Sequence, residues 1–258
     1  MPIKHGDNSM IKKLIILFLL IPSVCYGGVK LDGSDDRLSS STIIGDNFSY
    51  PFSVMFWFNP GERTGVAGGL IWQGDSTSNV DYWQIAVTAG DVLQIGMRRF
   101  TNVSKDGTTV IAGVDKYRCV VGVFAGNSDR KLYLDGELEI SDTTASSYPL
   151  GSNITCIGSW CRSIAGVESD YRFSEIAFWD AELTQEDAQR VCSGVKYAPL
   201  QSRFQPKHYW TLDQCGTSDA SCDGVEFKSF GGTDNTSLTG DDGAGNTGLI
   251  GSSSQTYP

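Results

Sequence analysis

The sequence predicts an all-β fold in which two antiparallel sheets pack face to face as a sandwich, with one short helix near residues 184–194. Glycine is frequent, with 30 residues among 258, and helical periodicities are few. Turn signals recur along the chain, at Asn59-Pro60, Ala89-Gly90-Asp91, Lys105-Asp106-Gly107 and Gly126-Asn127. This pattern indicates many short strands joined by loops, and the length is sufficient for one large sandwich and a tail.

Residues 1–28 have the layout of a secretory signal peptide. Lys12 and Lys13 precede an uncharged, mostly apolar run from Leu14 to Tyr26, and Gly27-Gly28 supplies small residues for cleavage. The run is shorter than the about 20 apolar residues of an ordinary transmembrane helix. We therefore expect a secreted, extracellular or periplasmic protein that a cell surface could retain, with no membrane span after cleavage. An uncleaved anchor, or a lipid anchor at Cys25, is the alternative.

Residues 131–140, KLYLDGELEI, predict a β-hairpin. A strand, a tight Asp135-Gly136 turn and a second strand follow one another directly. Leu132 and Leu134 alternate with Tyr133, so they belong to the opposite face of the hairpin from that ring.

A short helix is strongly specified after residue 183. Thr184 can cap it, with Asp187 as the reciprocal partner of a capping box. Leu183 can pack onto Ala188, and Gly194 offers a left-handed stop. The stripe that we expect to be buried consists of Ala188, Val191 and Cys192.

The order of four pieces resembles the laminin-G-like, concanavalin-A-like jelly-roll domains. These pieces are LDGSDDRLS (31–39), FSVMFWF (52–58), KLYLDGELEI (131–140) and YRFSEIAFWDAELTQEDAQRVCSG (171–194). The resemblance spans residues 29–213 and implies a two-sheet antiparallel jelly roll there. Many relatives carry a Trp just before the strand that leads to the hairpin, where this chain has Tyr117 and then Cys119.

Residues 214–258 predict a polar extension rich in Gly, Ser and Asp. From Gly231 onward the chain has scarcely any apolar residue, so it cannot by itself bury enough surface to offset its ordering entropy. Two alternatives are open: a loosely ordered extension, or a strap that lies over the sandwich.

Six cysteines remain once the leader is set aside, and an even count in an exported chain points to disulfides. Six cysteines allow 15 pairings. We expect all six to be oxidised. Short spacing favours Cys215 with Cys222 and Cys156 with Cys161, and the sequence does not choose among the other pairings. Zinc is disfavoured because the chain has no CxxC pair and its two His residues are His5 and His208.

The charge argues against nucleic-acid partners. The chain carries 20 Lys and Arg against 30 Asp and Glu, a formal net charge of −10, which repels phosphate backbones. It contains no basic cluster, P-loop or dinucleotide fingerprint.

The acidic pattern of a glycosidase is incomplete. Related glucanases use three acids on one strand, and here Glu168 and Asp170 lack the third. Glu137 and Glu139 are two residues apart in a hairpin, where solvated edge charges are the simpler interpretation. A Ser-His-Asp triad would need His208, for which nothing argues. We therefore predict a protein that is not an enzyme.

Aromatic side chains are the candidates for sugar binding, because sugar rings stack on Trp and Tyr. Trp160 lies in the short loop GSWCRS, which a Cys156–Cys161 bridge would hold, and Arg162 is adjacent. Tyr82 and Trp83 follow the polar run GDSTSNVD at residues 74–81 and are the second choice. The alternative is that these rings only cover the edge of a core. Three other tryptophans fall in apolar strand patterns typical of core packing, namely Trp57, Trp179 and Trp210.

The family resemblance also implies a structural Ca²⁺ held by carboxylate and backbone oxygens. The candidate ligands are Asp32, Asp35, Asp36 and Glu175. The alternative is that LDGSDD is an acidic turn.

The leading functional hypothesis is a secreted, lectin-like module that binds glycans or surface polymers, for instance in adhesion. The second hypothesis is a structural or assembly protein of a cell surface or virion, with surface proteins as partners. A glycan-active hydrolase is the third, and it would require a cleft with paired acids.

Overall fold

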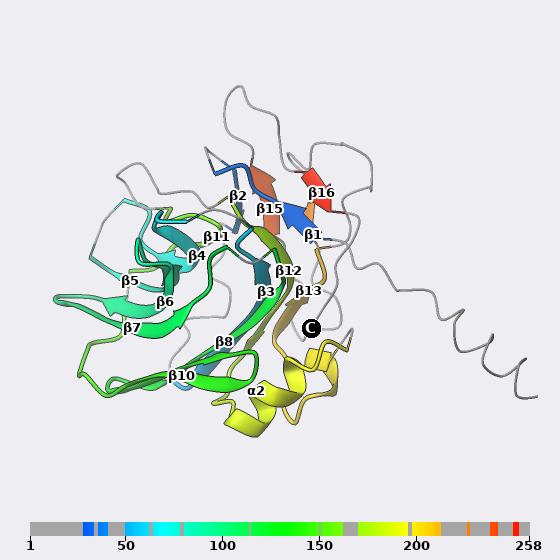
Figure 1. Cartoon of the computed structure of the whole chain (residues 1–258). Helices are drawn as coiled ribbons and strands as arrows, with labels where there is room; N and C mark the ends of the chain where they lie inside the picture. The colour runs from blue at the N-terminus through cyan, green and yellow to red at the C-terminus, as the bar shows by residue number, and fades with distance from the viewer. Residues whose placement is uncertain are drawn as a thin grey trace, which may run out of the picture.

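The computed structural model describes residues 28–33, 36–40, 50–61, 64–77, 80–113, 115–149, 151–161, 170–195 and 198–212, and the backbone of three short strands beyond them. Its strands form two antiparallel sheets, which confirms the predicted fold class (Figure 1). The predicted signal sequence before Gly28, as well as Asp35, Arg162, Cys215 and Cys222, lies outside the described residues.

The first sheet has β3 and β12 side by side in its middle. In spatial order it contains β10 (Glu137–Asp142), β9 (Asp129–Leu134), β8 (Arg118–Gly126), β3 (Phe52–Asn59), β12 (Arg172–Trp179), β1 (Gly28–Lys30) and β16 (Ile250–Ser252), with β13 (His208–Trp210) also paired to β12. The hairpin of β9 and β10 is the one that the sequence predicted.

The second sheet faces the first across the interior. In spatial order it contains β14 (Glu226–Phe227), β15 (Leu238–Asp241), β2 (Arg37–Ser40), β11 (Ile154–Ile157), β4 (Gly68–Gly74), β5 (Tyr82–Val87), β6 (Val92–Arg98) and β7 (Asn102–Val110). The segment after residue 213 therefore contributes strands to both sheets, because β15 pairs with β2 and β16 pairs with β1.

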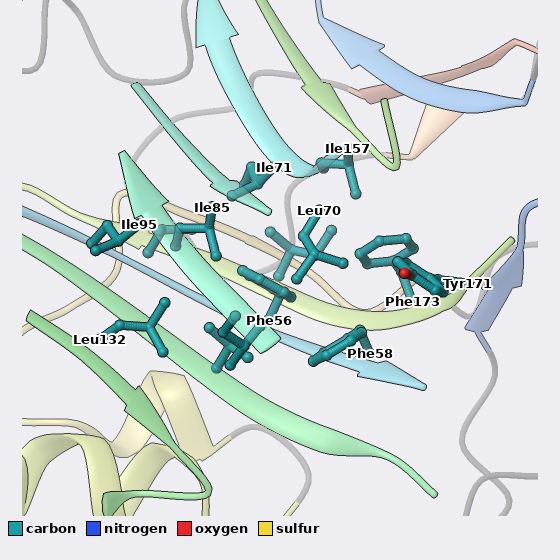
Figure 2. Packing of buried hydrophobic residues seen from close by; sticks show 14 of the residues in the cluster. Phe56, Phe58, Leu70, Ile71, Ile85, Ile95, Leu132, Ile157, Tyr171 and Phe173 are labelled. Carbon is teal, nitrogen blue, oxygen red and sulfur yellow. The ribbon is translucent and has the colours of Figure 1, made fainter. Parts of the chain in front are cut away.

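Apolar side chains from both sheets fill the space between them (Figure 2). Phe58 of β3 packs with Tyr171, with 6.0 Å between the ring centroids, at one end of this cluster. Ile95 of β6 and Leu132 of β9 lie toward the other end, and Phe56 lies between the two groups. Burial of each such side chain stabilises the fold by about 1.5–3 kcal/mol. The alternation of apolar and polar residues along a strand therefore fixes which of its faces points inward. Residues that point away from this interior are the candidates for binding.

A second apolar cluster covers the outer face of the first sheet. Tyr133 lies in this cluster, whereas Leu132 and Leu134 lie in the interior, as the hairpin pattern predicted. The helix α2 (Gln185–Val191) and the 3₁₀ turn η1 (Ala198–Gln201) pack over this face. The outer face of the first sheet is therefore occupied by the chain itself.

The helix has the ends that the sequence predicted. Asp187 N donates to Thr184 Oγ1 at 3.3 Å, and Thr184 N donates to Asp187 Oδ2 at 2.9 Å, which completes the capping box. Gly194 follows with φ of 74°, a conformation that costs glycine little. Cys192 is the C-cap residue and is only half-buried, whereas Ala188 and Val191 are buried as expected.

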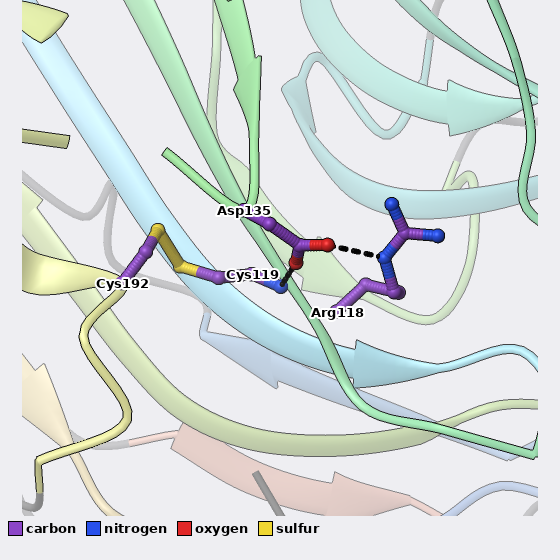
Figure 3. The surroundings of a disulfide bond; sticks show 4 residues. All are labelled: Arg118, Cys119, Asp135 and Cys192. Atoms are coloured by element: carbon purple, nitrogen blue, oxygen red, sulfur yellow. Dashed lines mark hydrogen bonds and ion pairs between the residues drawn. A yellow bond between two sulfur atoms is a disulfide. The ribbon is translucent and has the colours of Figure 1, made fainter. Parts of the chain in front are cut away.

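The disulfide between Cys119 and Cys192 joins β8 to the end of α2 (Figure 3). Cys119 stands near the position where many relatives have Trp, and its bridge spans a sequence separation of 73 residues. Asp135 of the predicted turn accepts hydrogen bonds from Cys119 N at 2.9 Å and from Arg118 Nε at 2.6 Å. The hairpin turn, β8 and the helix are therefore tied together at one point.

Candidate functional site: the outer face of the second sheet

The outer face of the second sheet carries polar side chains and aromatic rings. On β5 and β6 every second residue, such as Ile85 and Ile95, points into the interior. Successive side chains of a strand point to opposite faces, so the residues between them point outward. They are Tyr82, Gln84, Ala86, Gln94, Gly96 and Arg98.

The strand register aligns these outward residues in rows across the sheet. One row runs from Gly69 on β4 through Ala86 and Gln94 to Asp106 on β7. The next row consists of Cys156, Trp72, Gln84, Gly96 and Ser104. Because neighbouring strands are about 4.8 Å apart, each row places its side chains within reach of one another.

Trp160 lies at the β4 end of the first row. A disulfide joins Cys156 to Cys161 with 6.1 Å between the Cα atoms, and it closes the loop that carries Trp160. The indole lies directly on Gly69, where an added Cβ would be 2.6 Å from Trp160 Cδ1. Trp160 as a residue is half-buried, and its Nε1 atom is buried. Glycine at position 69 is thus what allows the indole to lie against the sheet.

Hydrogen bonds link three outward side chains of the two rows, from Gln84 on β5 to Asp106 on β7. Gln84 Nε2 donates to Gln94 Oε1 at 3.1 Å, and Gln94 Nε2 donates to Asp106 Oδ1 at 2.7 Å. Asp106 is exposed and Gln94 is half-buried. Amide and carboxylate groups retain further donor and acceptor capacity in this arrangement. Sequence reasoning missed these three residues, although the alternation along β5 and β6 was the signal that could have found them.

Tyr82 and Trp83 do not present their rings to solvent. Tyr82 points outward but is only 3% exposed, with its ring 6.0 Å from that of Trp72. Trp83 points inward and is fully buried, 5.3 Å from Phe52 and 5.2 Å from Phe124. The assignment of Trp83 to a sugar-binding surface is therefore wrong, because adjacent strand residues face opposite ways.

The acidic residues proposed as calcium ligands have other roles where the structure describes them. Asp36 is fully buried, and its Oδ2 accepts a hydrogen bond from Asp32 N at 2.8 Å. Glu175 is buried at an irregularity of the β12–β3 pairing, with φ of 39°. In the described part of the chain no three Asp, Glu, His or Cys side chains gather as a metal site. Asp35 lies outside the described residues, and calcium binding stays a prediction.

Glu137 and Glu139 lie on β10, the edge strand of the first sheet, where Glu137 is exposed and Glu139 is half-buried. Both also bind other parts of the protein. Glu137 accepts hydrogen bonds from Gln185 and Gln189 of the helix segment, both at 2.9 Å. Glu139 accepts from Thr109 N at 2.8 Å and from Thr109 Oγ1 at 2.7 Å, so it links β10 of the first sheet to β7 of the second. Burial alone would raise the pKa of Glu139, but the hydrogen bonds from Thr109 and Thr108 outweigh it, and the pKa lies below its usual value.

His208 also has a structural place. It is fully buried in β13, and its ring lies parallel to that of Trp210 with 5.3 Å between the centroids. A buried, stacked imidazole is not placed to act on a substrate.

Residues 32–189 match a family model described as the concanavalin A-like lectin/glucanases superfamily. The chain belongs to this superfamily. No curated protein matches the sequence. A heptameric SAP-like pentraxin from Limulus polyphemus has a similar structure, with a TM-score of 0.61 and 15% identity, over 90% of this chain and 97% of that chain.

Two further solved structures are similar. A Bacteroides ovatus protein named as carbohydrate-binding has a TM-score of 0.61 and 15% identity over 90% of this chain, which spans 61% of the length of that protein. The CBM40 domain of the Ruminococcus gnavus IT-sialidase has a TM-score of 0.50 and 13% identity over 64% of this chain and 96% of that chain. At identities this low, the structural similarity shows a shared fold and no more than that. In the described residues, no helix has the length and apolar character that a membrane crossing requires.

Proposed function

We propose that the protein is an exported, non-catalytic lectin-like module that binds glycans on the outer face of its second sheet. The observation that carries this proposal is the position of Trp160, which a disulfide holds on Gly69, on the same face of the sheet as the hydrogen-bonded residues Gln84, Gln94 and Asp106. The names of the Bacteroides and Ruminococcus relatives support a carbohydrate ligand, and the two disulfides support export.

In this proposal the sugar stacks on Trp160, and the hydrogen-bonded side chains of Gln84, Gln94 and Asp106 supply specificity. The apolar face of a pyranose lies on the indole. Gln94 and Asp106 lie two and three strands from Gly69, about 10 and 14 Å across the sheet, so the hydroxyls of a neighbouring sugar unit exchange hydrogen bonds with them. The disulfide and the mutual hydrogen bonds hold these groups before the ligand arrives, which lowers the entropic cost of binding. The net charge of −10 disfavours polyanionic glycans such as sulfated chains.

A glycan array probed with the mature chain tests the proposal. The parent should bind a subset of glycans, and Trp160→Ala should lose about tenfold or more in affinity if one stacking contact contributes about 1–3 kcal/mol. Phe204→Ala is the matched control, because Phe204 is another aromatic residue at the surface, 36% exposed, and its ring packs with Arg203 instead.

Two outcomes would contradict this function. Unchanged glycan binding by Trp160→Ala would place the site elsewhere. Absence of binding to every glycan, together with self-association in sedimentation, would favour the assembly hypothesis.

A further inference from the structure

A hollow of about 310 Å³ opens at one end of the sandwich, away from Trp160. It lies between the turn that joins β6 to β7, the turn that joins β8 to β9, and the segment that follows β10. Its lining consists of Phe100, Thr101, Asn127, Ala145, Ser146 and Ser147. Both sheets therefore contribute to it.

The wall formed by residues 143–147 is anchored at both ends. Before it, Arg130 is fully buried and donates from Nη2 to Asp142 Oδ2 at 2.7 Å and to Thr144 O at 2.6 Å. After it, the ring of Tyr148 packs edge-on against Tyr50 with 5.2 Å between the centroids. Between these anchors, Ser146 N donates to Asn127 O at 2.8 Å. The hollow is thus held in shape by buried groups of the fold.

Phe100 forms the opposite wall and is the most exposed large apolar side chain in the described residues, at 79%. The guanidinium of Arg99 lies 4.9 Å from the ring centroid. A cation at this distance is attracted to the face of the ring and restricts its orientation. The Arg99 guanidinium therefore lies over the Phe100 ring, and most of the ring stays accessible to a ligand.

From this geometry we propose that the hollow is a second, independent saccharide site that binds one or two neutral sugar units. An aromatic ring, three hydroxyls and an amide line it, and they match the apolar face and the hydroxyls of a sugar. No charged side chain is among these lining residues, which argues for a neutral ligand. Small-molecule sites occupy about 300–1,000 Å³, and this hollow lies at the lower end of that range.

The second site is distinct from the face that carries Trp160. Trp160 lies on Gly69, which pairs with Ala86. Phe100 comes two residues after Arg98, which pairs with Tyr82. Ala86 and Tyr82 are four residues apart on β5, or about 13 Å along the strand. A single sugar unit cannot contact both rings, so each site can be tested alone.

Nuclear magnetic resonance titration of the mature chain with cellobiose, lactose and diacetylchitobiose tests this inference. At least one disaccharide should shift the backbone amides of residues 99–101, 127 and 145–147. Phe100→Ala should lower the affinity obtained from these shifts by about tenfold or more. Trp160→Ala and Phe204→Ala should leave them unchanged, so failure here and failure of the proposed function at Trp160 are separable.

Three outcomes would overturn the inference. The first is the absence of shifts at these amides with all three sugars. The second is that the shifts survive Phe100→Ala in a variant whose melting temperature equals that of the parent. The third is that the parent binds phosphatidylcholine–phosphatidylserine vesicles and Phe100→Ala does not, which would make Phe100 a membrane contact. A lone apolar side chain among hydroxyls is a weak membrane anchor, so we expect no vesicle binding by the parent.

Discussion

Arg130 and Asp142 form an ion pair inside the sandwich, with 2.7 Å between Nη2 and Oδ2 and with side chains that are 0% and 3% exposed. The pair joins β9 to the end of β10 and fixes the wall of the hollow beside Phe100. Removal of one partner would leave the other charge buried without its counter-ion.

We therefore expect Arg130→Met to lower the free energy of unfolding by about 3–5 kcal/mol. The double variant Arg130→Met/Asp142→Leu should recover much of this loss, because neither charge is then buried. Urea denaturation of the two variants and the parent measures both effects. Equal losses in the single and double variants would show that the charge pairing is not the cause.

The two disulfides should have different effects when removed. The Cys119–Cys192 bridge closes a separation of 73 residues, and chain entropy assigns it about 4 kcal/mol. The Cys156–Cys161 bridge closes a separation of 5 residues, for which the same model gives about 2 kcal/mol. Denaturation of the two Cys→Ser double variants should show the larger loss for Cys119→Ser/Cys192→Ser.

Glycan binding should show the reverse order. Cys156→Ser/Cys161→Ser releases the loop of Trp160 and should weaken glycan binding. Cys119→Ser/Cys192→Ser alters the outer face of the first sheet, on the other side of the sandwich from Trp160, and should leave glycan binding nearly unchanged. Affinity is measured below the melting temperature of both variants. Equal weakening in the two would indicate that general stability, and not the loop, controls binding.

Gly69→Val should displace the indole of Trp160. Any Cβ at position 69 would lie 2.6 Å from Trp160 Cδ1 and 2.8 Å from the backbone carbon of Ser159, so the ring and its loop must shift. We expect weaker glycan binding and a changed Trp fluorescence. Gly90→Val is the control, because the nearest contact of an added Cβ there is Thr88 Oγ1 at 3.5 Å.

Stability should fall in acid through three carboxylates. Burial raises the pKa values of Glu139, Asp142 and Asp187, but hydrogen bonds, joined for the two aspartates by nearby arginines, lower each pKa below its ordinary value. A group whose folded pKa is depressed stabilises the fold fully above the unfolded pKa, and this stabilisation is lost as the pH falls through the folded pKa. Melting temperatures should therefore be flat above about pH 5 and fall below it.

Glu139→Gln isolates one of these groups. The amide keeps one acceptor oxygen for Thr109 but cannot titrate, so the variant should melt lower at neutral pH and depend less on pH in acid. Glu186→Gln is the control, since Glu186 is exposed and pairs only within its helix with Arg190. An unchanged acid slope in Glu139→Gln would exclude Glu139 as a contributor.

The sequence by itself determined the features that depend on near neighbours in the chain. The capping box of Thr184 and Asp187, the stop at Gly194 and the hairpin around Asp135 follow from steric preferences and hydrogen bonds over a few residues. The bridge from Cys156 to Cys161 belongs to the same class, because its short loop makes the pairing local.

Tertiary structure decided everything that depends on which strands meet and in what register. Cys119 finds Cys192 because α2 folds back over the first sheet, and Glu139 reaches Thr109 because the edges of the two sheets meet. The register likewise places Gln84, Gln94 and Asp106 in contact, while alternation buries Trp83 beside the outward Tyr82. A shift of one residue in the register would reverse every face, and local patterns do not fix the register of strands far apart in the chain.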